Sequence, residues 1–243
     1  MQFMRADMLS RVPDQPDHAK TCLKSYGLHS VWLVQPGSGP PRILKVWPLG
    51  LWTAMKIAMG IAQPQRQIRG LERLRRIGVR TPACIGSWRI GRRGLRPMIV
   101  LELEYAPGHS AWELICNAPD SPRVDRHSLV RAAREVGAAV VAMANGKVFH
   151  RDLKPSNVVL NLADPQQPEA WIIDTVGVRR MRRRAVEIER MLERLAIQPI
   201  RLDAAVAREI RTALLRCALR PLTRAERREV LDGLRMRVNL TGP

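Results

Sequence analysis

The sequence of 243 residues predicts an α+β protein in which a small β-rich part precedes a helical part. Two β-prone runs, residues 31–34 and 42–47, flank a turn rich in Gly and Pro and predict a hairpin with a long connection. A third β-prone run follows at residues 98–104. Downstream, apolar residues recur at helical spacing. The length and the 46% hydrophobic content suffice for one large domain or two lobes.

Three further segments lie before residue 98. Residues 1–21 are polar and contain two prolines, so we expect a flexible N-terminal arm. Residues 49–61 are apolar and lightly charged, and two readings stay open: packing on their own domain, or an amphipathic segment facing a membrane. Residues 65–77 have helical spacing, with Gln67 on the face of the apolar side chains, and the helix should end near Gly78.

The helical part begins with a core helix of about twenty residues that ends near Asn145-Gly146. After Gly177, helical spacing recurs three times, and Thr223 to Glu226 predicts a capping box for the last helix. Residues 178–243 are few for a platform that holds a peptide substrate. We therefore expect this helical part to be abbreviated.

The charge of the chain favours acidic partners. Forty-one Lys and Arg residues against 22 Asp and Glu residues leave a formal charge of +19, which suits a nucleotide, an anionic lipid or glycolipid, or nucleic acid. A general excess of arginine would explain the charge equally well. Nucleic acid is the least favoured partner, because no interleaved aromatic residues accompany the arginines.

The cysteines and the hydropathy point to the cytoplasm. The four cysteines are widely separated and form no Cys-x-x-Cys pair, so neither a zinc site nor a disulfide framework is indicated. We find neither a leader-like start nor a run of about eighteen uncharged apolar residues. These observations predict a protein of the reducing cytoplasm.

Residues 150–157, His-Arg-Asp-Leu-Lys-Pro-Ser-Asn, follow the core helix and carry the chemistry of phosphoryl transfer. Asp152 is placed to accept the proton of an attacking hydroxyl, and Lys154 to neutralise charge on the transferring phosphate. Asn157 offers an amide oxygen, a suitable ligand for magnesium. A buried run at residues 170–173 then presents a second carboxylate, Asp174. The sequence therefore predicts a kinase.

These two stretches resemble the protein-kinase-like superfamily. The resemblance implies a two-lobed fold, with an N-lobe over residues 22–105 and a helical C-lobe over residues 106–243, and it implies ATP and Mg²⁺ as cofactors. It also implies that Asp174, with Asn157, holds the magnesium ions that bridge the nucleotide phosphates. The usual Asp-Phe-Gly motif is Asp174-Thr175-Val176-Gly177 here.

The resemblance further implies nucleotide contacts in the N-lobe. Lys45 would reach the α and β phosphates from its strand. The phosphate-covering loop keeps only one of its glycines, Gly27, with Ser30 as a further small donor. The main chain of Glu104 and Ala106 would bind adenine.

The carboxylate that normally pairs with the strand lysine is replaced. Gln67 occupies that helix position, and the nearest carboxylate, Glu72, points about 100° away from Leu71. Either Gln67 would hydrogen-bond Lys45, or the helix would rotate to bring in Glu72.

The abbreviated C-lobe and an arginine cluster directly after Asp174, residues 179–184, are most similar to the bacterial lipopolysaccharide-core kinases. That resemblance implies transfer to a Kdo or heptose sugar of the inner core by a cytoplasmic enzyme that contacts the inner membrane peripherally. A Ser/Thr protein kinase is the alternative, and a pseudokinase or nucleotide-binding regulatory module is the alternative of another class.

The arginine cluster either engages an anionic acceptor such as a phosphorylated glycolipid, or it is a solvated helix start with an Arg183–Glu187 pair.

Overall fold

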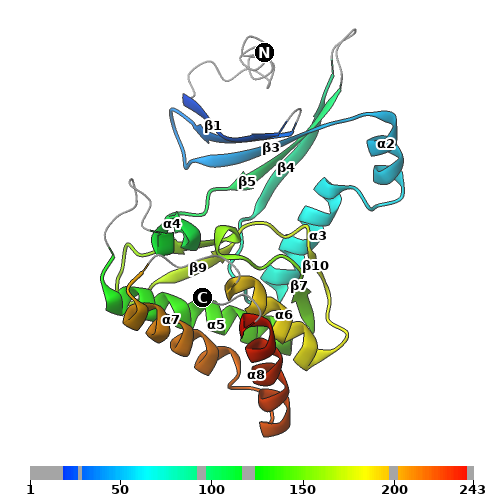
Figure 1. Ribbon diagram of the computed structural model, residues 1–243. Helices are drawn as coiled ribbons and strands as arrows, with labels where there is room; N and C mark the ends of the chain where they lie inside the picture. The colour runs from blue at the N-terminus through cyan, green and yellow to red at the C-terminus, as the bar shows by residue number, and fades with distance from the viewer. Residues whose placement is uncertain (1–18, 27–28, 92–96, 117–123, 197–201, 240–243) are drawn as a thin grey trace. The chain divides into compact units, whose positions relative to one another are not determined.

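The computed structural model describes residues 19–26, 29–91, 97–116, 124–196 and 202–239 (Figure 1). The chain forms two compact units, one of residues 1–66 and 82–105 and the other of residues 67–81 and 106–243. The division falls within helix α3 (Gln63–Arg76), which the helical spacing predicted over residues 65–77. Most of this helix belongs to the second unit, since its buried Leu74 joins the core there.

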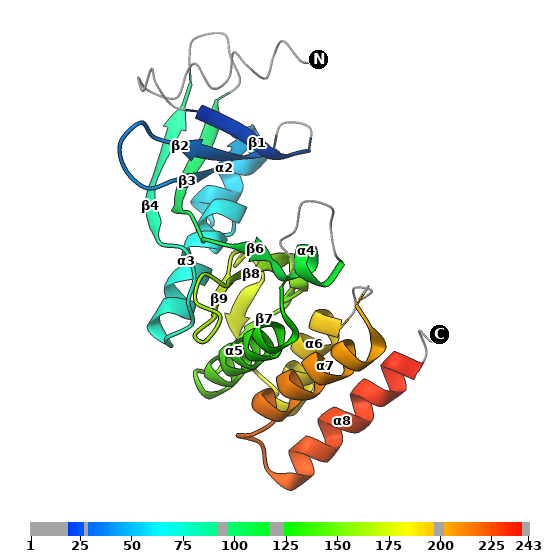
Figure 2. The ribbon, with the colours of Figure 1, turned by 90° about the vertical axis from the view of Figure 1, so that its left-hand side faces the viewer.

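The first unit is built on one antiparallel sheet of five strands in the order β1-β2-β3-β5-β4 (Figures 1 and 2). The predicted hairpin is confirmed, because β2 and β3 pair directly, with Val31 opposite Lys45. One face of the sheet carries a small apolar cluster that includes Leu44 and Val100. The strands are β1 (Ala19–Tyr26), β2 (His29–Gln35), β3 (Arg42–Pro48), β4 (Cys84–Ile90) and β5 (Met98–Glu104).

Strand β1 begins inside the segment that was expected to be a flexible arm. Ala19 pairs with Gln35 and Lys20 with Val34, so backbone hydrogen bonding to β2 orders the chain from Ala19 onward. Most side chains of the strand are exposed, and its sequence shows no strong apolar alternation. Residues 1–18 of the predicted arm lie outside the described residues.

Helix α2 (Leu51–Ala58) fills the apolar segment predicted over residues 49–61. No side chain of this helix is buried. Leu51 is 92% exposed and Trp52 is 63% exposed, and the Lys56 ammonium lies 5.2 Å from the centre of the Trp52 ring. The apolar side chains of α2 therefore do not pack into a core within the described residues.

The second unit combines helices with two small sheets. One sheet pairs β10 with β7, and the other has the order β6-β8-β9. The strands are β6 (His109–Ser110), β7 (Val148–His150), β8 (Val158–Asn161), β9 (Glu169–Ile172) and β10 (Val178–Arg180). The helices are α4 (Ala111–Cys116), α5 (Arg126–Asn145), α6 (Arg184–Ala196), α7 (Ala204–Ala218) and α8 (Arg224–Asn239).

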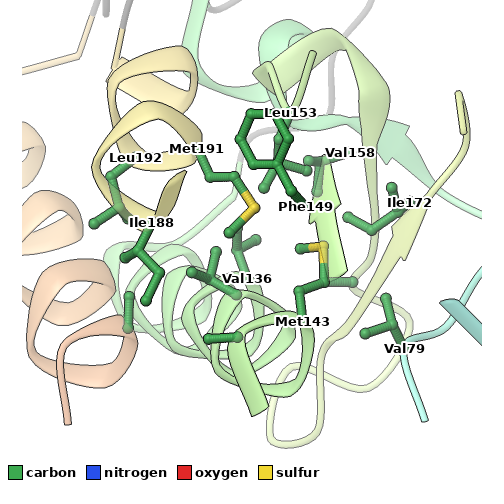
Figure 3. Packing of buried hydrophobic residues seen from close by; sticks show 14 of the residues in the cluster. Val79, Val136, Met143, Phe149, Leu153, Val158, Ile172, Ile188, Met191 and Leu192 are labelled. Atoms are coloured by element: carbon green, nitrogen blue, oxygen red, sulfur yellow. The ribbon is translucent and has the colours of Figure 1, made fainter. Parts of the chain in front are cut away.

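The core of the second unit forms around α5, the predicted core helix. Asp125 caps its N-terminus by accepting from the Ser128 backbone N–H at 3.0 Å, and its hydrogen bonds with Ser128 lower the pKa of Asp125. Val140 and Met143 of the helix are fully buried. Figure 3 shows Met143 and Val136 facing Phe149, Ile172 and Met191 from the surrounding strands and α6. This packing fixes β7 and β8, the strands on either side of residues 151–157, which are the predicted catalytic loop.

The three predicted C-terminal helices are confirmed. Helix α7 packs along α5, as Figure 2 shows, and α8 packs on α6. The Thr223–Glu226 capping box is also confirmed, with reciprocal hydrogen bonds of 2.8 and 3.2 Å. In the part of the chain that the structure describes, no helix combines the length and apolarity needed to cross a bilayer.

Candidate active site

The catalytic loop is held between two strands of the second unit. The chain leaves α5, passes through β7 and turns at residues 151–154. It then forms a short 3₁₀ helix, η1 (Pro155–Asn157), and continues into β8. Pro155 suits the first position of this turn, because its ring fixes φ and no N–H donor is needed there.

The three side chains predicted to act in this loop lie together. Lys154 Nζ is 3.2 Å from Asp152 Oδ2. Asn157 donates from Nδ2 to the backbone oxygen of Asp152 at 2.9 Å and to its Oδ2 at 3.4 Å. Asp152 and Lys154 are 39% and 37% exposed, so both can meet a substrate, while Asn157 is buried. The loop thus presents a carboxylate beside an ammonium group.

His150 supports Asp152 from the interior of the unit. The imidazole is fully buried, and its Nδ1 accepts a hydrogen bond from the Asp152 backbone N–H at 3.2 Å. Burial lowers the pKa of His150, and the backbone of Asp174 opposes this shift without reversing it. A neutral ring with Nδ1 as acceptor therefore supports the backbone of the catalytic loop.

The segment that carries Asp174 runs beside the same loop. Val158 of β8 pairs with Ile172 of β9, and the Ile173 N–H donates to the Asn157 oxygen at 3.0 Å. The predicted strand ends at Ile172, just before Asp174. The strand pairing therefore puts Asn157 and the Asp174 segment side by side.

The donor set at this position suits magnesium. Because Asn157 uses its Nδ2 within the loop, its Oδ1 remains the atom that can ligate a cation, and Asp174 adds a carboxylate. Among the described residues no group of three or more His, Cys, Asp or Glu side chains could hold a metal alone. The Asn157 amide oxygen and the Asp174 carboxylate fit a hard cation that takes its other ligands from water and phosphate oxygens.

Gln67 binds the backbone next to Asp174. It is fully buried, and its Nε2 donates to the Ile173 oxygen at 3.3 Å. In return, Thr175 Oγ1 donates to the Gln67 backbone oxygen at 2.7 Å. Glu72, the other candidate partner of Lys45, has an exposed side chain. Gln67 and Thr175 together tie α3 to the segment that carries Asp174.

Gly70 allows this close approach of α3. A Cβ added at Gly70 would lie 2.2 Å from the Thr175 backbone oxygen and 2.7 Å from the Thr175 Cβ. Only glycine fits this position. The sequence reasoning missed His150, Gly70 and Thr175 as positioning residues, and a glycine inside a helical pattern was the one signal that could have pointed to Gly70.

The predicted nucleotide contacts are distributed over the two units. Lys45 is half-buried in the middle of β3, opposite Leu101 of β5. Ser30 lies on β2, where its Oγ accepts from the Trp32 indole N–H at 2.8 Å. Gly27 is outside the described residues. Ser30 and Lys45 thus share one sheet of the first unit.

The expected adenine-binding segment follows β5. The Glu104 N–H donates to the Ala83 oxygen at 2.9 Å, and the Glu104 carboxylate accepts from the Ala83 N–H at 2.9 Å. The Glu104 N–H is therefore already used within the first unit. Ala106 is buried and begins the continuous part of the second unit.

Arg179 of the arginine cluster has a structural role. Arg179 donates to Glu187 at 2.6 Å, and its guanidinium lies 4.4 Å from the centre of the Phe149 ring. The second Glu187 oxygen accepts from the Arg182 backbone N–H at 2.7 Å. The expected Arg183–Glu187 pair is therefore wrong, because both Glu187 oxygens are used by Arg179 and Arg182.

Comparison with known proteins agrees with the kinase geometry. A model of the lipopolysaccharide kinase (Kdo/WaaP) family matches residues 53–208. A solved structure of WaaP in complex with acyl carrier protein is similar over 93% of this chain and 90% of that chain, with a TM-score of 0.57 and 15% sequence identity. That likeness confirms a kinase-like fold with a small β-rich part and a helical part. No curated protein sequence matches the chain.

Proposed function

The chain belongs to the lipopolysaccharide kinase (Kdo/WaaP) family and is a kinase, and from this membership we propose that it transfers the γ-phosphoryl group of ATP to a sugar hydroxyl of the lipopolysaccharide inner core. The observation that carries the proposal is the grouping of Asp152, Lys154 and Asn157 in one loop, with the Asp174 segment hydrogen-bonded beside it.

Each residue of the loop has a distinct role in the proposed transfer. Asp152 accepts the proton of the acceptor hydroxyl, and its partly exposed side chain makes this contact possible. Lys154 follows the negative charge that moves to the transferring phosphate. His150, neutral and buried, keeps the Asp152 backbone in place. Proton removal and charge neutralisation are thus performed by adjacent side chains.

The remaining residues hold the nucleotide and its metal. Asn157 and Asp174 would ligate Mg²⁺, which when bound neutralises charge on the nucleotide phosphates. Lys45 would contact the α and β phosphates, and Gly27 and Ser30 would cover them. The main chain of Glu104 and Ala106 would bind adenine. Gln67 supports the Asp174 segment, which is our explanation for an amide at that helix position.

We further propose that the enzyme is cytoplasmic and contacts the inner membrane peripherally through α2. This helix exposes Leu51, Trp52 and Met55, and it carries a cation, Lys56, in its last turn. An indole next to a lysine on an apolar helix is suited to the boundary between headgroups and acyl chains. The net charge of +19 adds attraction to anionic lipids.

Vesicle sedimentation tests this contact. A Trp52→Ser/Met55→Ser variant should lose most of its binding to vesicles that contain about 30% phosphatidylglycerol, a composition chosen to resemble a natural anionic surface. Ile85→Ser is the matched control, because Ile85 is an exposed apolar residue on β4 of the same unit. Equal loss in both variants would argue against a specific role of α2.

The acceptor is tested by offering radiolabelled ATP and Mg²⁺ with three acceptors in parallel: an inner-core glycolipid, a generic protein substrate, and the enzyme alone. We expect label in the glycolipid, and no transfer by Asp174→Asn. Label in the protein substrate alone would refute the sugar acceptor and favour the protein-kinase alternative, which uses the same loop. Absence of transfer to every acceptor would favour the pseudokinase alternative.

The similar WaaP structure is a complex with acyl carrier protein. At 15% identity this likeness shows the fold alone.

A further inference from the structure

A basic pocket lies in the second unit, apart from the catalytic loop. Its volume is about 460 Å³, and Ala144 and Met181 supply apolar lining. Asn145 also lines it, and four cationic residues complete the wall: Lys147, Arg180, Arg182 and Arg184. All lie where α5 ends, where β10 ends and where α6 begins.

The backbone fixes the positions of these cations. Arg180 pairs with Val148 across the β10–β7 ladder, and the Met181 N–H donates to the Lys147 oxygen at 2.7 Å. Lys147 has φ of 53°, a left-handed conformation that is uncommon for a lysine. The β10–β7 pairing and the hydrogen bond from Met181 to Lys147 therefore hold the turn that presents Lys147.

The charges around the pocket are not neutralised. The structure gives no acidic partner to Lys147, Arg180 or Arg182 among the residues that it describes, and all three side chains are exposed. The nearby Glu187 is buried and used by Arg179 and by the Arg182 backbone. A cavity bordered by three uncompensated cations attracts an anion, and a guanidinium is well suited to phosphate oxygens.

Arg184 differs from the other three cations because its side chain is hydrogen-bonded to neighbouring residues. Its Nη2 donates to Asn145 Oδ1 and to the Pro221 oxygen, each at 3.4 Å. Hydrogen bonds from Thr223 are the largest cause of the lowered pKa of Glu226, and the charge of Arg184 adds to that shift. Arg184 therefore helps to hold α6 in place, and we keep it unchanged in the test below.

We propose that this pocket binds a phosphate group carried by the acceptor, at a site separate from the one for ATP. The inference rests on the proposed function and specifies in addition that the acceptor itself carries a phosphate group. The β7–β10 ladder joins the two sites, since Val178 pairs with His150 next to the catalytic loop and Arg180 pairs with Val148 next to the pocket. Val178 and Arg180 are two residue steps apart, which corresponds to about 7 Å of strand, so the proposal requires an acceptor of more than one sugar.

Binding is measured by calorimetry with the full-length protein without ATP, using glucose 6-phosphate as the probe and glucose as the uncharged control. In Arg180→Gln/Arg182→Gln we expect the dissociation constant for glucose 6-phosphate to rise about tenfold or more, because two charge-assisted contacts are lost. The substitutions spare the Arg182 N–H that donates to Glu187. Arg183→Gln, an exposed neighbour that does not line the pocket, should bind like the wild type.

Unchanged binding in Arg180→Gln/Arg182→Gln, with circular dichroism equal to the wild type, would overturn the proposal. Vesicles of phosphatidic acid in phosphatidylcholine form the second arm. Pocket-dependent binding to these vesicles, without binding of glucose 6-phosphate, would overturn the assignment to the acceptor and place a lipid headgroup there. Asp152→Ala should bind the probe normally, so a failure of the catalytic assignment and a failure of the pocket give different results.

Discussion

Substitution of Gly70 by Ala tests whether α3 and the Asp174 segment are packed as closely as the structure shows. The new Cβ would lie 2.2 Å from the Thr175 backbone oxygen. An ordinary contact between carbon and oxygen is about 3.3 Å or longer, so the two groups must separate by about 1 Å. The crowded atom belongs to the backbone and cannot turn away as a flexible side chain would.

The stability change is the sum of two opposing effects. Alanine is a better helix former than glycine by about 1 kcal/mol, which would stabilise the variant. Overpacking typically costs about 1–3 kcal/mol, and the upper end applies here because a backbone segment must move. We therefore expect the free energy of unfolding to fall by about 2 kcal/mol. Activity should fall further, since a shift of about 1 Å at Asp174 can cost about a hundredfold in rate.

Urea unfolding followed by circular dichroism and labelled-ATP transfer measure the two effects. Arg75→Ala is the matched control: Arg75 is exposed on the same helix, and the substitution should leave both quantities near the wild-type values. If Gly70→Ala were as stable as the wild type or more stable, and fully active, the close packing of α3 on Thr175 would be refuted.

Two further substitutions probe the supports of the site. Thr175→Val removes the hydroxyl that donates to Gln67 and should lower the free energy of unfolding in urea by about 1 kcal/mol. Thr175→Ser keeps the hydroxyl and should retain most of that stability. Equal losses in the two variants would contradict the hydrogen bond. The lowered pKa of buried His150 predicts a pH effect, because below about pH 6.5 the unfolded chain takes up a proton that the folded chain resists. The free energy of unfolding should therefore decline from about pH 7.5 to about pH 5.5. His150→Asn, whose Oδ1 can still accept from the Asp152 N–H, should decline less, and parallel curves would contradict the assignment.

Much of the fold and the chemistry could be predicted from local sequence. Helical spacing located α3, α5 and the three C-terminal helices, because their apolar faces are long and regular. The loop from Asp152 to Asn157 is a contiguous motif, so its grouping follows from the chain itself. Strands β1 and β4 escaped prediction because they carry little regular apolar alternation and depend on backbone pairing in the sheet.

The supports of the site depend on contacts between distant parts of the chain. Gln67 and Thr175 are 108 residues apart, and nothing local shows that the amide binds the Asp174 segment. The same is true of the basic pocket, since Lys147 and Arg180 meet only through the β7–β10 ladder. The local pattern suggested Arg183 as the partner of Glu187 because the spacing is i,i+4, but the Arg179 side chain reaches that carboxylate from β10.

The central claim is that Asp152 is the base that accepts the hydroxyl proton during phosphoryl transfer. It is tested most directly by comparing wild-type protein and Asp152→Ala. Labelled-ATP transfer to inner-core glycolipid would be measured beside the dissociation constant for Mg²⁺–ATP. We predict that the variant loses transfer while its nucleotide affinity stays within about threefold of the wild type, because in the proposed mechanism Asp152 contacts the hydroxyl and not the nucleotide. Undiminished transfer by Asp152→Ala would contradict the account.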